Sequence, residues 1–129
     1  MERTRILAIE SKTKIGLELK SFLEEWGYQV EWVWDAGEAI EVLEGKVPDV
    51  VVTDVDLPGF DGPFLTRLIK AHPDYRGVPV IAIGVTTPEM EQAAVQSGCI
   101  ACFSAPLDQE RLLALIRELA PIPTLAASA

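Results

Sequence analysis

The stretch that decides the fold covers residues 48 to 62 and reads Pro48-Asp49-Val50-Val51-Val52-Thr53-Asp54-Val55-Asp56-Leu57-Pro58-Gly59-Phe60-Asp61-Gly62. Three consecutive valines without polar alternation predict a central strand that is covered on both faces, as in a parallel sheet with helices above and below. The run then breaks into Asp54, Asp56 and a turn. Because open α/β sheets bind ligands outside the carboxyl ends of their strands, these carboxylates are placed for chemistry.

Composition predicts one acidic globular domain. The chain has 129 residues, of which 49% are hydrophobic, and a formal net charge of −9. Such a charge disfavours binding to nucleic acid or to an anionic membrane, where basic surfaces supply most of the affinity. Neither a secretory leader nor an apolar run of roughly 20 residues is present, so we expect a cytoplasmic protein. Residues 1–120 should form the domain, and 121–129, rich in proline and alanine, a tail or the start of a linker.

Apolar periodicity divides the chain into alternating strands and helices. Strands are expected at 6–9, 28–34, 50–52, 78–83 and 100–103, and helices at 12–26, 35–44, 62–71, 87–97 and 108–119. Asp35 with Glu38 reads as a capping box, and Gly98 as a helix stop. Strict alternation of this kind predicts parallel strands joined by right-handed crossovers, with helices on both faces of the sheet.

These features together resemble a response-regulator receiver domain of two-component signalling. The resemblance rests on the order of elements, on Asp54 at the end of the third strand, and on the loop from Leu57 to Gly62, which is similar to the family's Leu-Pro-Gly-Met-Asp-Gly. Ser104-Ala105-Pro106 stands where the family has Ser-Lys-Pro. The resemblance implies a flavodoxin-like doubly wound sheet of five parallel strands, order 2-1-3-4-5, which brings Glu10 and Asp54 into one crevice.

The resemblance also implies a phosphoryl-transfer site. Asp54 corresponds to the phosphoacceptor, whose carboxylate attacks phosphorus and forms an acyl phosphate. Magnesium would be held by Glu10, Asp54 and the backbone carbonyl of Asp56. The family further uses a second acid beside the first, a lysine, a Ser/Thr hydroxyl and an aromatic side chain that turns inward.

All four of these additional groups are replaced. Ser11 stands in place of the second acid, Gly84 in place of the Ser/Thr, Ala105 in place of the lysine and Cys102 in place of the aromatic residue. Neighbouring Thr86 or Thr87 could supply a hydroxyl only if the loop moved. We therefore predict weak Mg²⁺ binding, disfavoured phosphorylation, and an output that depends mainly on protein partners rather than on enzymatic turnover.

Two alternatives remain open from the sequence. The first is an ordinary receiver that accepts phosphate on Asp54 from a histidine kinase. The second is an enzyme, because Glu10 with Asp54-x-Asp56 is also similar to the Toprim arrangement for magnesium-dependent phosphodiester chemistry. The acidic charge and the Leu57 to Gly62 loop argue against the enzyme.

The expected partners are a histidine kinase or a downstream effector protein. In the family, the fourth helix, fifth strand and fifth helix form the usual docking and dimer face, and its candidate residues here are Met90, Ala94, Leu112 and Leu115. A wide core stripe explains the same four residues almost as well. Trp32 and Trp34, on the second strand, either pack against a helix or form an exposed aromatic stripe.

Overall fold

The computed structural model describes residues 3–57 and 62–122, which form five strands and five helices in alternation. The predicted loop residues 58–61 and the tail residues 123–129 lie outside the described residues. In chain order the elements are β1 (Arg5–Ile9), α1 (Thr13–Glu25), β2 (Gln29–Val33), α2 (Ala36–Gly45), β3 (Val50–Asp54), α3 (Gly62–Ala71), β4 (Val80–Val85), α4 (Pro88–Ser97), β5 (Ala101–Ser104) and α5 (Gln109–Leu119).

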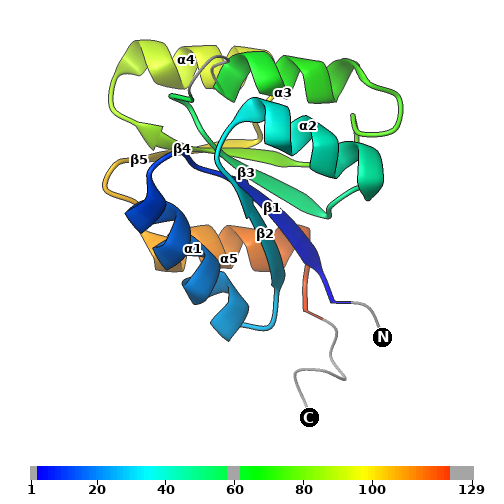
Figure 1. Ribbon diagram of the computed structural model, residues 1–129. Helices are drawn as coiled ribbons and strands as arrows, with labels where there is room; N and C mark the ends of the chain where they lie inside the picture. Colours follow the sequence, from blue (N-terminus) through cyan, green and yellow to red (C-terminus); the bar gives the residue numbers. More distant parts are fainter. Residues whose placement is uncertain (1–2, 58–61, 123–129) are drawn as a thin grey trace.

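The five strands form one parallel sheet in the order β2-β1-β3-β4-β5, as predicted. Helices α1 and α5 cover one face, and α2, α3 and α4 cover the other (Figure 1). Every residue of β3 is buried. Val50 and Val52 pack toward α1 and α5, whereas Val51 packs toward α2 and α3. The valine run is therefore the two-sided central strand that its sequence predicts.

Local capping fixes where several helices begin and end. Asp35 accepts a hydrogen bond from the Glu38 N–H, as the predicted capping box requires. The Glu38 carboxylate accepts one from the N–H of Trp34, the residue before the N-cap, rather than from Asp35 itself. Gly98 ends α4 with a φ of 114°, a left-handed conformation that favours glycine. These contacts depend on neighbours in sequence, which is why the sequence alone predicted them.

The fourth strand begins and ends two residues later than predicted. Val78 lies before the strand, where its carbonyl accepts a hydrogen bond from Lys70 Nζ instead of a neighbouring strand. At the other end the strand continues to Val85, with one extra residue between Ala82 and Val85 relative to β5. This bulge contains Gly84 at a φ of 79°, and Gly84 lies against the Asp54 carboxylate.

Among the described residues, no helix has the length and apolar character needed to span a membrane.

Candidate functional site

Glu10 and Asp54 meet at the carboxyl end of the sheet. Asp54 is the last residue of β3 and Glu10 directly follows β1, and the two residues are 2% and 1% exposed. Both line a hollow of about 390 Å³ that also contains Lys12, Gly84 and Ala105. The structure thus brings the predicted acids together at the strand ends.

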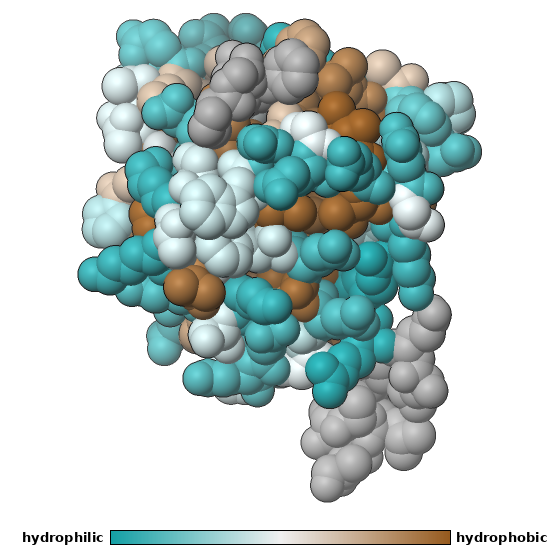
Figure 2. Space-filling model, in the orientation of Figure 1, coloured by the Kyte–Doolittle hydropathy of each residue, from teal (hydrophilic) through white to brown (hydrophobic). Residues whose placement is uncertain are grey.

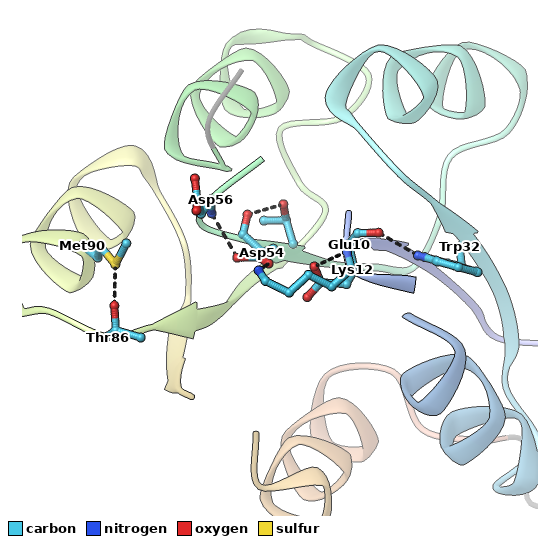
Figure 3. A network of polar contacts seen from close by, with 8 residues as sticks. Glu10, Lys12, Trp32, Asp54, Asp56, Thr86 and Met90 are labelled. Carbon is cyan, nitrogen blue, oxygen red and sulfur yellow. Dashed lines mark hydrogen bonds and ion pairs between the residues drawn. The ribbon is translucent and has the colours of Figure 1, made fainter. Parts of the chain in front are cut away.

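Both oxygens of the Asp54 carboxylate have partners. Oδ1 accepts a hydrogen bond from the Asp56 N–H at 3.0 Å. Oδ2 accepts one from Lys12 Nζ at 3.3 Å, in an ion pair (Figure 3). Asp56 itself is exposed. A phosphoryl group could approach Oδ2 only if the Lys12 ammonium moved aside.

Hydrogen bonds hold both the backbone and the side chain of Glu10. Its N–H donates to the Val33 carbonyl at 3.0 Å, its carbonyl accepts from Trp32 Nε1 at 2.9 Å, and its Oε2 accepts from the Lys12 N–H at 3.1 Å. Burial raises the pKa of Glu10 from 4.5 to about 7. A hydrogen bond to Asp54 and the charge of Asp54 act in the same direction, and the Lys12 backbone N–H and ammonium oppose them. Near neutral pH, the two acids therefore carry less than two full negative charges.

Lys12 is the site residue that the sequence analysis missed. Its side chain is 58% exposed, yet it reaches down to an Asp54 side chain that is only 3% exposed. The charge of Asp54 is the main cause that raises the pKa of Lys12. Lysine is also an unusual N-cap, and the Lys12 side chain makes no capping hydrogen bond to α1. Two sequence features could have identified Lys12: it follows the strand-end acid Glu10 by two residues, and it stands at a helix N-cap, where lysine is unusual.

Gly84 fills the predicted Ser/Thr position with backbone alone. A Cβ on Gly84 would lie 2.6 Å from Asp54 Oδ1, and the φ of 79° also disfavours any side chain. A hydroxyl-bearing residue could not be placed here without moving the Asp54 carboxylate or the β4 backbone.

The hydroxyl groups of the two neighbouring threonines form hydrogen bonds with Met90 of α4. The Thr86 hydroxyl donates to Met90 Sδ at 3.3 Å (Figure 3). The Thr87 hydroxyl accepts from the Met90 N–H at 3.1 Å. Thr86 borders the hollow, but its side chain is directed to α4. The prediction that neither threonine substitutes without loop movement is consistent with these contacts.

Ala105 and Cys102 stand at the positions where the resemblance expects a lysine and an aromatic residue. Ala105 is exposed and offers a methyl group. Cys102 is partly buried and packs against Val55 and Ala82, and burial, followed by the charges of Cys99 and Glu91, raises its pKa. Neither residue supplies a cation or an aromatic ring to Asp54.

The acids as arranged do not form a complete magnesium site. The described residues contain no cluster of three or more His, Cys, Asp or Glu side chains suited to a metal ion. Magnesium requires near-octahedral oxygen coordination at about 2.0–2.1 Å. Here Ser11 replaces one carboxylate, and an ammonium already occupies Asp54 Oδ2.

The predicted docking residues need correction. Ala94 and Leu112 are fully buried, so they belong to the core and cannot contact a partner. Met90 and Leu115 are partly buried and pack against core residues. The apolar side chains that the structure leaves exposed on this side are Val95 on α4 and Ile100 before β5, at 57% and 55%.

Of the two tryptophans at the β2 edge, one packs against a helix and the other has an exposed aromatic ring. Trp32 packs over Gly16 of α1, where an added Cβ would clash with the indole, so it is a packing residue. Trp34 stacks on it with ring centroids 5.7 Å apart and is 49% exposed.

A separate apolar hollow of about 280 Å³ lies between α2 and α3, lined in part by Ile40, Leu43, Leu65 and Leu68. Figure 2 shows hydrophobic side chains gathered over these helices.

Comparison with known proteins decides the family. The sequence model described as the response regulator receiver domain matches residues 6–117. The chain belongs to the receiver domain family. This assignment overturns the Toprim-like alternative, because the receiver fold accounts for both the sheet order and the placement of the acids.

Two curated relatives illustrate the match. The receiver domain is 30% identical over 115 residues to Protein PilH of Pseudomonas aeruginosa, with 87% of this chain and 93% of PilH covered. It is 31% identical over 115 residues to the transcriptional regulatory protein YxdJ of Bacillus subtilis, with coverage of 88% and 49%. It thus spans about half the length of YxdJ.

One structural relative contains a magnesium ion. The receiver domain of a sensor histidine kinase from Pseudomonas aeruginosa PAO1, with magnesium coordinated in its active-site cleft, has a TM-score of 0.84 and 25% identity. The match covers 92% of this chain and 98% of that one.

Proposed function

We propose that this receiver domain acts in two-component signal transduction mainly by binding protein partners, with little contribution from phosphorylation of Asp54. The observation that supports this proposal most directly is the state of the Asp54 carboxylate. Its two oxygens are engaged by Asp56 and Lys12, while Ala105 and Gly84 offer nothing to an incoming phosphate. The domain would not be a turnover enzyme and at most would gain and lose its own phosphate.

The chemistry of phosphoryl transfer explains why these replacements matter. Transfer to a carboxylate depends on in-line positioning and on fixed positive charge around the phosphoryl oxygens. Removing one such charge costs on the order of several kcal/mol in the transition state, or roughly a thousandfold in rate. Ala105 removes the charge that the family places on this side, and Lys12 now pairs with the nucleophile itself. Both changes favour slow phosphorylation.

Partners are proposed from the family. A histidine kinase or a downstream effector is the expected partner, and a homodimer through α4, β5 and α5 is a further proposal. Val95 and Ile100 are the exposed apolar residues that such a contact would cover, with Met90 and Leu115 at its margin. We propose a cytoplasmic location and no direct binding to nucleic acid or membrane, in keeping with the net charge of −9.

Titration with beryllofluoride and MgCl₂ tests the proposal. Trp32 fluorescence and the amide NMR signals of Glu10, Asp54 and Asp56 report on the site, because Trp32 Nε1 binds the Glu10 carbonyl. We expect no saturable change at millimolar magnesium with the phosphate mimic present. Saturable shifts at these residues would instead establish an ordinary phosphorylatable receiver.

A restored variant serves as the positive control for this titration. Ser11→Asp with Ala105→Lys returns the missing acid and cation to positions on either side of Asp54, and Lys12→Met in the same protein removes the ammonium from Asp54 Oδ2. Binding of the mimic by this variant, but not by the natural sequence, would show that the assay detects a competent site.

A further inference from the structure

On the basis of the proposed function, we infer that Lys12 is an internal cation that occupies the metal position beside Asp54 and excludes divalent ions. The receiver would then hold its acidic site in one arrangement without magnesium. Lys12 would act as a positioning residue for Asp54 and as a competitor of any metal.

The contact that carries this inference joins a fixed backbone to a buried carboxylate. Lys12 Nζ lies 3.3 Å from Asp54 Oδ2, across 42 residues of sequence. The Lys12 N–H donates to Glu10 Oε2, and the Glu10 carbonyl accepts from Trp32. These bonds hold the backbone of Lys12 in place (Figure 3). The ion pair with Asp54 therefore costs only the conformational entropy of the Lys12 side chain.

The charges around the hollow leave this role to Lys12 alone. Among the described residues that line the hollow, Glu10, Glu18, Asp54 and Asp56 are acidic, and Lys12 is the only basic residue. A buried carboxylate requires a counter-charge or several hydrogen bonds. Within residues 3–57 and 62–122, the Asp54 carboxylate receives one backbone hydrogen bond, from Asp56, and the ammonium supplies the charge.

Lys12 and a divalent ion cannot both occupy this place. Magnesium would bind a carboxylate oxygen directly, and an ammonium 3.3 Å from that same oxygen would face it as a like charge. The two cations therefore compete, and the free energy that Lys12 contributes to the site lowers magnesium affinity by the same amount. Ser11 weakens the metal's side of this competition, because it removes a carboxylate and leaves the ammonium unaffected.

Magnesium binding by four proteins tests the inference, without any phosphate mimic. The proteins are the natural sequence, Lys12→Met, Lys12→Arg and Lys14→Met, titrated by calorimetry and followed by Mn²⁺ broadening of the Glu10 and Asp54 amide signals. Lys14 is exposed on the same helix, so Lys14→Met matches the change in net charge without touching the site.

We expect Lys12→Met to bind magnesium about tenfold or more tightly than the natural sequence, and Lys12→Arg and Lys14→Met to bind as weakly as it does. The inference is overturned if Lys12→Met gains no affinity, or if Lys14→Met gains as much. That outcome would leave the proposed function standing, because the proposed function is tested by beryllofluoride and not by magnesium alone.

Thermal unfolding in EDTA gives a second readout. Lys12→Met should lower Tm because it leaves the buried Asp54 without its cation, and millimolar magnesium should restore Tm in this variant only. In an Asp54→Asn background, Lys12→Met should leave both Tm and magnesium affinity unchanged. Loss of Tm that persists in the Asp54→Asn background would assign Lys12 a general stabilising role and overturn the inference.

Discussion

The two sides of the crevice present opposite kinds of groups to Asp54. On the side of β1 and β3, Glu10 and Asp54 remain buried together, and Lys12 has joined them. On the side of β4 and β5, Gly84 and Ala105 leave backbone and a methyl group. The comparison teaches that the acidic side contains its own counter-charge in Lys12, whereas Gly84 and Ala105 on the other side offer no polar side chain to Asp54.

The largest expected effect is at Gly84, where the two sides touch. Gly84→Ala places a Cβ 2.6 Å from Asp54 Oδ1 at a φ of 79°. The strained backbone and the clash together should lower the free energy of unfolding by about 3 to 4 kcal/mol, measured by urea denaturation. Gly77→Ala is the matched control, since nothing lies within 4 Å of an added Cβ there.

An equal, small cost for both variants would show that the strand end can move away from Asp54. In an Asp54→Ala background the clash disappears, so Gly84→Ala should then cost only the backbone strain, about 1 to 2 kcal/mol.

The next effect is a pH dependence that arises on the acidic side. The pKa of Glu10 is raised to about 7, so between pH 4.5 and 7 the folded state holds a proton that the unfolded state has lost. Stability from this group is fully present below pH 4.5 and falls as pH rises through 7, by up to about 3 kcal/mol. Urea denaturation from pH 5 to 8 measures it.

Glu10→Gln should flatten this profile, because the amide does not titrate. Glu18→Gln is the control, since Glu18 is exposed at the rim of the same hollow. A natural protein as stable at pH 8 as at pH 5 would contradict the assignment to Glu10.

A smaller effect is expected at Trp32, which holds the loop of the acidic side. Trp32→Phe keeps most of the packing over α1 but removes the 2.9 Å hydrogen bond from Nε1 to the Glu10 carbonyl. The expected loss of unfolding free energy is about 1 to 1.5 kcal/mol. Trp34→Phe, at the exposed ring of the stacked pair, should cost less than about 0.5 kcal/mol. Equal costs for the two variants would contradict a positioning role for Trp32.

The sequence predicted the parts of the fold that depend on local signals. The valine run of β3, the Asp35–Glu38 capping box and the Gly98 stop are each set by residues close in the chain. The sheet order was predicted from the resemblance to receiver domains. That resemblance rested on the order of elements and on the loop after Asp54.

The rest depended on tertiary placement. The Lys12–Asp54 pair joins residues 42 apart, so the spacing of Lys12 from Glu10 marks Lys12 as a site residue but does not reveal its pairing with Asp54. Ala94 and Leu112 were candidates for a docking face because an apolar residue reads the same whether it faces the core or a partner. The positive φ of Gly84 follows from a bulge that only strand pairing reveals.

The smallest effect on stability is expected at Ala105. A substitution there distinguishes whether Lys12 or the β5 side of the crevice limits binding of the phosphate mimic. Ala105 is exposed, so Ala105→Lys should change the free energy of unfolding by no more than about 0.5 kcal/mol. If the empty side alone limits phosphate binding, this variant binds beryllofluoride with magnesium. We expect instead that Ala105→Lys alone gains little, because Lys12 still occupies Asp54 Oδ2, and that binding of the mimic requires Ala105→Lys together with Lys12→Met. Full binding by Ala105→Lys alone would place the limiting defect on β5 and reduce Lys12 to a surface ion pair.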